Sequence, residues 1–339
     1  MQHDTENDQA LWDGLIDDYV AGAGWLPDGR LAYVASVSGW LYGFSGTFGT
    51  EVFRVQAHPN GLNTLAVSPL DGRLLTAGKD GLAKLWQPDT GVLLAELPAG
   101  ADWVEHAAFS PNGRHILTAA GKTLILWRGD GSELIRYTDF ESTISALHWR
   151  DADHFAVACY GAIRLFQVGS KRPFEQLIWK TPMISLLWSP DGRYVLAGTQ
   201  DARIQVWKTP FVPGDELEMS GYPNKVKELS WCVPKQWVAT NSGKQIMIWD
   251  MAGKGPEGQR PMSLPGHIDK ITRLAFQPAD EWLASGDTVG LVIVRHTRKP
   301  SYLIEDAIGS PIAQLAWSAD GRRLLIGTES GQVVVWQHE

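Results

Sequence analysis

Hydrophobic and polar positions along this chain follow a pattern that repeats about every forty residues. Each unit opens with a short apolar stretch and a turn signal such as Asp71-Gly72 or Asp191-Gly192. A second apolar stretch follows, and the third stretch alternates toward a large apolar residue. These closing residues are 39 to 45 positions apart: Phe44, Trp86, Trp127, Phe166, Trp207, Trp249, Val294 and Trp336. Because Asp-Gly pairs supply the positive φ angles of tight hairpin turns, the pattern predicts hairpins of short strands.

A fourth strand is expected in each unit, because one more apolar residue recurs seven positions before the next unit's first strand. These residues are Val55, Leu97, Tyr137, Leu177, Met219 and Leu264. Four short strands repeated at this period are typical of a β-propeller blade. We therefore predict an all-β fold, an eight-bladed β-propeller of four-stranded antiparallel blades.

The repeat leaves no room for a second domain, so residues 1–339 are expected to form a single propeller. Its units lie near 17–56, 57–98, 99–138, 139–179, 180–220, 221–265, 266–306 and 307–339. The chain ends just after a third strand, at Trp336. We expect residues 7–12 to supply the missing fourth strand and close the ring, which removes an open sheet edge.

Charge and composition narrow the choice of partner. The formal net charge is −8, and a negative field disfavours nucleic acid and anionic membranes as primary partners. The N-terminal residues are polar and acidic, unlike a signal peptide, and no run of 18 apolar residues occurs. We expect a soluble, cytoplasmic protein.

These features resemble the WD-repeat family, in a compact, prokaryotic-looking, single-propeller form. Gly266-His267 and Trp249-Asp250 match the two dipeptides of that family. The resemblance implies a buried polar network of His58, Thr76, Asp80 and Trp86 in the second unit. The fifth unit keeps Asp201 and Trp207 but has Lys180 at the His position, and the seventh has Val289 at the Asp position. Most members of the family have seven blades, which is the alternative to the eight counted here.

Two patterns in the sequence could indicate chemistry, a hydrolase triad and a metal site. Ser, His and Asp recur together, but His58, Thr76 and Asp80 match the structural network, and no nucleophile elbow occurs. His106 and His148 lie in adjacent first strands and are candidate metal ligands, although a zinc site needs three or four. We therefore expect no enzymatic activity and no cofactor.

The resemblance directs attention to the top face, which we define as the loops entering each first strand together with the bends between second and third strands. WD-repeat proteins usually bind proteins or peptides there. The candidate contact residues on this face are Asp18, Tyr19, Lys79, Asp102, Trp103, Tyr160, Lys225, Asp269 and Lys270. Trp103 and Tyr19 are large aromatics at positions that need no core anchor, and such residues are typical of interface hot spots.

The function expected from the sequence is a non-enzymatic scaffold that binds a protein or peptide on this face. A metal-binding or metallochaperone-associated propeller is the first alternative. It rests on the two histidines and on a resemblance of residues 218–223 and 253–258 to propellers that accompany metal-trafficking GTPases. A propeller enzyme is the second alternative, disfavoured because no catalytic constellation is visible.

Overall fold

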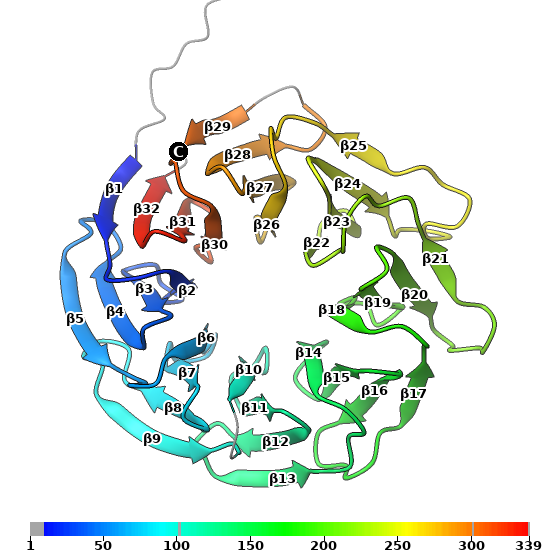
Figure 1. Cartoon of the computed structure of the whole chain (residues 1–339), viewed down its shortest axis with the longest axis horizontal. Helices are drawn as coiled ribbons and strands as arrows, with labels where there is room; N and C mark the ends of the chain where they lie inside the picture. The colour runs from blue at the N-terminus through cyan, green and yellow to red at the C-terminus, as the bar shows by residue number, and fades with distance from the viewer. Residues whose placement is uncertain (1–9, 101–102, 300–301, 338–339) are drawn as a thin grey trace, which may run out of the picture.

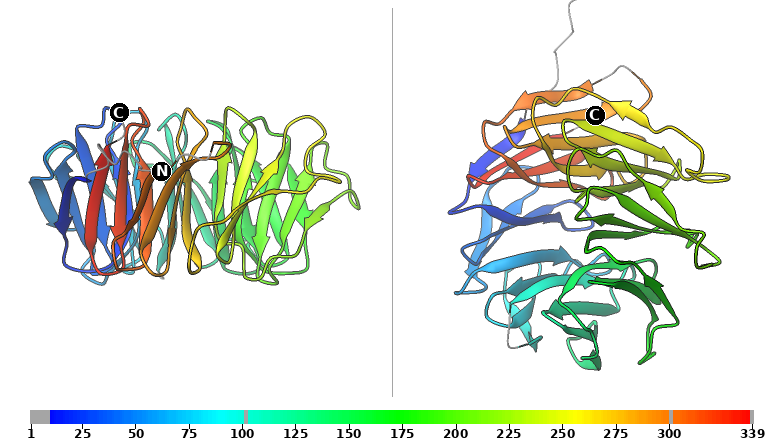
Figure 2. Two further views of the ribbon diagram at one scale, coloured as in Figure 1. Left: turned by 90° about the horizontal axis from the view of Figure 1, so that it is seen from above. Right: turned by 45° about the vertical axis from the view of Figure 1, so that its right-hand side comes forward.

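The chain forms a ring of eight antiparallel sheets around a central axis, in a computed structural model that describes residues 10–100, 103–299 and 302–337 (Figure 1). Each sheet has four strands, so the predicted eight-bladed β-propeller is confirmed and the seven-bladed alternative is wrong. The first strand of each blade lies nearest the axis and the fourth lies at the rim. Seen from the side, the ring is a disc with loops on both faces (Figure 2).

The first four blades follow one another along the chain, with their strands in sequence order from axis to rim. Blade 1 contains β2 (Val20–Trp25), β3 (Leu31–Ser36), β4 (Trp40–Ser45) and β5 (Glu51–Gln56). Blade 2 contains β6 (Leu62–Val67), β7 (Leu74–Gly78), β8 (Leu82–Trp86) and β9 (Leu93–Pro98). Blade 3 contains β10 (Val104–Phe109), β11 (His115–Ala120), β12 (Thr123–Arg128) and β13 (Glu133–Tyr137). Blade 4 contains β14 (Ile144–Trp149), β15 (His154–Cys159), β16 (Ala162–Gln167) and β17 (Glu175–Ile178).

The remaining blades keep this order, except that the last takes its outer strand from the start of the chain. Blade 5 contains β18 (Met183–Trp188), β19 (Tyr194–Thr199), β20 (Ile204–Lys208) and β21 (Leu217–Met219). Blade 6 contains β22 (Leu229–Cys232), β23 (Trp237–Ser242), β24 (Gln245–Asp250) and β25 (Met262–Leu264). Blade 7 contains β26 (Ile271–Phe276), β27 (Trp282–Asp287), β28 (Leu291–His296) and β29 (Tyr302–Ala307). Blade 8 contains β30 (Ile312–Trp317), β31 (Arg323–Thr328), β32 (Gln332–Gln337) and β1 (Ala10–Leu15).

The ring is closed by β1, which pairs antiparallel with β32. The pairing places Trp12 opposite Val335 and Leu15 opposite Gln332. This strand, Ala10–Leu15, overlaps the segment 7–12 that was expected to close the ring, and residues 7–9 lie outside the described part of the chain. Trp12 also donates from Nε1 to the Gly46 carbonyl at 3.1 Å, so the closing strand is joined to blade 1 as well as to blade 8.

The core consists of apolar layers between neighbouring sheets. One such layer joins Leu85 and Leu97 of blade 2 to Phe109 and Trp127 of blade 3. Flat aromatic side chains fill such layers well, which explains the abundance of tryptophan. Trp103 is the exposed tryptophan of the described chain, whereas Trp12 and Trp237 are buried although they lie outside the two repeated anchor positions.

Among the described residues, none belongs to a helix long and apolar enough to cross a bilayer. Every strand runs from one face of the disc to the other, so the loops gather on two faces. The fold therefore offers three kinds of surface: the two faces and the rim of fourth strands.

Candidate partner-binding face

The top face carries an aromatic sector, which we define as Lys79, Trp103 and Tyr160. Trp103 directly precedes β10 and is 55% exposed. The Lys79 ammonium, from the bend between β7 and β8, lies 4.9 Å from the centre of the Trp103 ring. A cation over an exposed indole contributes about 0.5–1 kcal/mol, so this contact orients the ring without burying it. Blades 2 and 3 thereby present one aromatic platform.

Tyr160 belongs to the next blade, in the bend between β15 and β16. Its side chain is 59% exposed, and its backbone N–H donates to Ser142 Oγ at 2.8 Å. That bond joins the bend to the loop that enters β14 and fixes the backbone from which the ring projects. The tyrosine is therefore a second exposed aromatic on this face.

The lysine sector lies over blades 6 and 7. Its lysines are all exposed: Lys225, Lys227, Lys244 and Lys270. The Lys225 ammonium donates to Gln200 Oε1 at 3.0 Å, and Asp269 accepts from the Lys270 backbone N–H at 2.8 Å. Ile268, two residues before Lys270, is 65% exposed. Sequence reasoning missed Lys227, Lys244 and Ile268, although all three follow from the turn positions in units 6 and 7.

Two predicted residues of blade 1 do not form a comparable platform. Tyr19 is half-buried and packs against the apolar layer between blades 8 and 1, so it is partly a core residue. Asp18 is exposed and accepts from the Tyr19 backbone N–H at 2.8 Å. Asp102 lies outside the described residues.

Asp17, which was not among the residues predicted for this face, accepts more side-chain hydrogen bonds than Asp18. It accepts from the Tyr42 hydroxyl at 2.8 Å and from Ser38. Burial tends to raise the pKa of its carboxyl, but hydrogen bonds from Ser38, Tyr42 and Ser36 prevail and lower it. The group is therefore an ionised acceptor that joins the loop entering β2 to Ser38 and Tyr42 of blade 1.

The polar network of blade 2 is complete. The Trp86 indole N–H donates to Thr76 Oγ1 at 2.9 Å, and Thr76 lies 2.8 Å from His58 Nε2. His58 Nδ1 lies 2.9 Å from Asp80 Oδ1. A neutral ring with its proton on Nδ1 satisfies all of these contacts, since the Thr76 hydroxyl then donates to Nε2. Burial lowers the pKa of His58 despite the nearby Asp80 carboxylate, which keeps the ring neutral.

Other blades reach similar networks by different residues. In blade 7, His267 Nδ1 lies 3.0 Å from Asp287 Oδ2 and Nε2 lies 2.8 Å from Ser285 Oγ. Val289 does occupy the position of Asp80, because the second and third strands of blades 2 and 7 pair in the same register. The carboxylate of blade 7 comes instead from Asp287, which occupies the position of Gly78 and is fully buried. In blade 6, the Tyr222 hydroxyl replaces the imidazole, lying 2.9 Å from Thr240 Oγ1 and accepting from the Trp249 indole at 2.8 Å.

The candidate metal ligands have a different role in the structure. His148 Nδ1 accepts from the Trp188 backbone N–H at 3.2 Å. Ser230 Oγ accepts from the Phe276 backbone N–H in the same way, two blades further along. Burial lowers the pKa of His148 to about 4 and that of His106 below its usual value. In the part of the chain that is described, no three His, Cys, Asp or Glu side chains converge on a point that could hold a metal ion.

Sequence comparison agrees with this geometry. The family model described as "WD domain, G-beta repeat" matches residues 49–87, 91–128, 179–208, 258–288 and 304–337, half of the chain. The chain belongs to the WD-repeat family. The parts of this WD-repeat chain that the model leaves unmatched, such as blade 4, still form four-stranded blades.

Its similar proteins are distant and longer. The chain is 21% identical over 291 residues to "Autophagy-related protein 16" of Arabidopsis thaliana, covering 84% of this chain and 57% of that protein. It is 27% identical over 155 residues to "Small ribosomal subunit protein RACK1y" of Oryza sativa subsp. japonica, covering 46% and 37%. The chain thus spans little more than half the length of the first relative.

A solved structure supports the same fold. The crystal structure of the computationally designed Ika8 protein superposes with a TM-score of 0.84 at 20% identity, covering 97% of this WD-repeat chain and 99% of that one. Agreement at this identity concerns the fold alone.

Proposed function

We propose that this WD-repeat protein is a non-enzymatic, cytoplasmic scaffold that binds a protein or peptide partner on its top face. Membership of the WD-repeat family and similarity to proteins named for autophagy and for the small ribosomal subunit support a role in protein interaction. We choose the top face because Trp103 is exposed there and lies under the Lys79 ammonium. Exposed aromatics of this kind contribute strongly to binding when a partner covers them.

The lysine sector supplies the second half of the proposed surface. Four exposed lysines and the exposed apolar Ile268 side chain in the top-face loops of blades 6 and 7 suit a partner that combines carboxylates with an apolar contact. Because the whole molecule has a net charge of −8, this local reversal of sign orients the partner on the face. Binding should accordingly weaken at high salt.

The test compares two exposed aromatics on opposite faces. The full-length protein, Trp103→Ala and Phe48→Ala are used to capture partners from native lysate, with mass spectrometry as the readout. Phe48 is 77% exposed in the hairpin between β4 and β5, so it is matched in chemistry but lies on the other face. We expect Trp103→Ala to lower capture at least about tenfold, since buried aromatic anchors contribute about 2 kcal/mol or more. The proposal would be wrong if Phe48→Ala lost the partner and Trp103→Ala kept it.

A further inference from the structure

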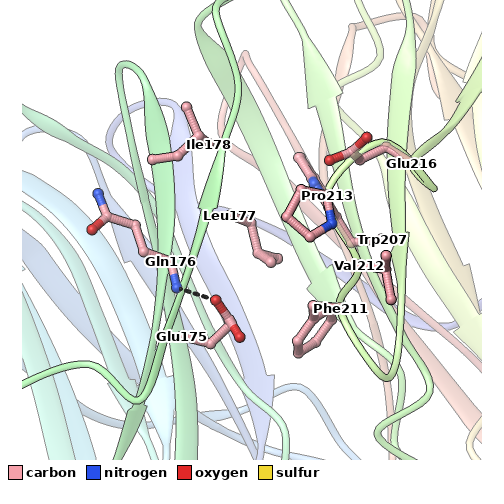
Figure 3. A pocket seen from close by; sticks show the side chains of 9 residues that line it. All are labelled: Glu175, Gln176, Leu177, Ile178, Trp207, Phe211, Val212, Pro213 and Glu216. Atoms are coloured by element: carbon pink, nitrogen blue, oxygen red, sulfur yellow. Dashed lines mark hydrogen bonds between the residues drawn. The ribbon is translucent and has the colours of Figure 1, made fainter.

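The rim between blades 4 and 5 contains an open cavity of about 120 Å³ that the top face does not use (Figure 3). One wall is strand β17, and the other is the segment 211–216 that connects β20 to β21. The Leu177 and Glu175 side chains point toward Phe211 and Pro213 across the cavity. Since a cavity of roughly 150 Å³ holds a benzene molecule, this one suits a single aliphatic side chain.

The floor of the cavity is apolar and its two sides are acidic. Leu177 and Trp207 are buried beneath it, and Val212 is 49% exposed at its edge. Glu175 and Glu216 stand on opposite sides, and the described residues that line the cavity include no lysine or arginine (Figure 3). A neighbouring hollow that shares Val212 and Glu216 adds further charged residues, namely Asp215, Glu257 and Lys208. The lining charges of the two hollows together favour a basic ligand.

Strand β17 is also a free sheet edge. Among the described strands it pairs with β16 alone, with Leu177 opposite Ile163. Trp179 donates from its backbone N–H to the Gly161 carbonyl at 3.0 Å. Backbone groups alternate in direction along an antiparallel strand, so those of Gln176 and Ile178 point outward. Glu175 Oε1 accepts from the Gln176 N–H at 2.9 Å, which leaves Ile178 as the unshielded position. An edge of this kind can pair with an added strand.

In blade 2, a proline protects the equivalent sheet edge. Its fourth strand has Pro98 opposite Leu82, whereas blade 4 has Ile178 opposite Ala162, so the two residues occupy equivalent positions. Proline has no N–H to offer to an added strand and is a usual protection of sheet edges. Ile178 is instead 64% exposed and keeps its outward N–H. Blade 1 also lacks a proline at this position, with Gln56 opposite Trp40, but blade 4 combines the unprotected edge with a neighbouring cavity.

We propose that this rim groove binds an extended basic peptide segment of a partner protein, which adds as a strand to the outer edge of β17. Side chains at alternate positions of such a strand point to the same side. One aliphatic side chain would enter the cavity over Leu177, and lysine or arginine side chains two positions before and after it would face Glu175 and Glu216. The site is separate from the top face, so one molecule can hold two partners.

The test uses the full-length protein and fluorescent heptapeptides in a polarisation assay. The probe is Thr-Lys-Val-Leu-Val-Lys-Thr, with one version in which glutamate replaces both lysines and another in which alanine replaces leucine. We expect saturable binding of the lysine peptide, and binding at least about tenfold weaker for the glutamate version, because charge complementarity selects the partner. Equal binding of the lysine and glutamate versions, or no binding of any version, overturns the proposal.

Protein variants locate the binding. Ile178→Pro removes the outward N–H in a position where blade 2 already has proline, and Val212→Arg blocks the cavity from an exposed site. Each should weaken the lysine peptide about tenfold, which corresponds to about 1.4 kcal/mol. Leu94→Arg, on the exposed rim of blade 2, is the matched control and should bind as the wild type does, as should Trp103→Ala. Should Ile178→Pro lower the melting temperature, Val212→Arg decides; unchanged binding by that variant overturns the proposal.

Discussion

Blades 2 and 5 have the same four strands but differ in their polar interiors. In blade 2, the Trp86 indole N–H has an acceptor in Thr76, which in turn meets His58. In blade 5, the equivalent Trp207 is just as buried, yet its Nε1 has no hydrogen-bond partner among the residues that the structure describes. Ala197 stands where blade 2 has Thr76, and the exposed Lys180 where it has His58.

The difference shows which interaction builds a blade. An unsatisfied buried donor costs about 1–3 kcal/mol, but blade 5 still forms its complete sheet. Apolar packing compensates: Trp207 meets Trp179 edge to face, with ring centres 6.2 Å apart, and lies in a layer with Trp188 and Val195. Burial between sheets is therefore sufficient for the fold, and the polar network adds stability to the blades that have it.

The largest effect is expected where blade 5 depends on packing alone. Trp188 is 2% exposed between blades 4 and 5, with the Arg150 guanidinium 4.7 Å from its ring centre. Trp188→Ala should lower the free energy of unfolding by about 3–5 kcal/mol, because it leaves a large cavity. Urea denaturation measures the change. The equivalent residue of blade 2 is the half-buried Val67, and Val67→Ala should cost clearly less; equal costs would contradict the importance of packing in blade 5.

Acid should weaken the interface that His148 bridges. Burial lowers the pKa of His148 to about 4 in the folded protein, below the value of about 6.5 in an unfolded chain. The fold prefers the neutral ring, so this contribution is complete above pH ~6.5 and is lost as the pH falls toward 4. The loss should reach roughly 3 kcal/mol, at about 1.4 kcal/mol per pKa unit.

A variant that keeps the acceptor but cannot titrate isolates this effect. His148→Asn can still accept from the Trp188 backbone N–H, so its stability should fall less steeply between pH 6.5 and 4.5. Urea denaturation of both proteins across this range measures the slopes. Identical slopes would show that other groups cause the acid sensitivity.

Substitution of His58 breaks the polar network of blade 2, and the equivalent residue of blade 5, Lys180, is exposed and, within the described chain, belongs to no such network. His58→Ala leaves Thr76 and Asp80 without their partner in a buried site, which should cost about 2 kcal/mol. Lys180→Ala changes the equivalent, exposed position and should stay within about 0.5 kcal/mol. Melting temperatures of the two variants provide the comparison. A similar loss in both would mean that the network contributes little.

The repeat made the fold predictable, because eight spaced anchors and their turn signals constrain the number and order of strands. Details that depend on a single residue were not predictable. The carboxylate of the blade 7 network comes from Asp287, at the position that Gly78 occupies in blade 2, rather than from position 289.

The candidate site was only partly predictable for a different reason. Trp103 stood out because it breaks the repeat, and the structure shows it exposed. The half-burial of Tyr19 and the pairing of His148 depend on a neighbouring blade, which a single unit does not reveal. The rim groove arises from β17 and the segment 211–216, which lie in different units and meet only when the ring forms.

The smallest expected effect comes from a substitution that gives the Trp207 indole N–H of blade 5 an acceptor. Ala197→Thr places a hydroxyl at the position equivalent to Thr76, where it can accept from Trp207 Nε1. It can also donate to the Gln205 carbonyl, as Thr240 donates to the Met247 carbonyl at 3.3 Å in blade 6. Because a satisfied hydrogen bond is worth about 1 kcal/mol, the threonine variant should be more stable than Ala197→Val by about that amount.

Valine is the decisive control, since it has the shape of threonine without the hydroxyl, and any strain from the added volume is common to both variants. Elsewhere in an apolar core valine is the better choice, because a buried hydroxyl without partners costs free energy. A more stable threonine variant at position 197 would therefore show that the orphan indole N–H of Trp207 is a real deficit of blade 5. If valine proves the more stable of the two, the N–H is already compensated by its packing against Trp179, and the two blades differ less than their hydrogen bonds indicate.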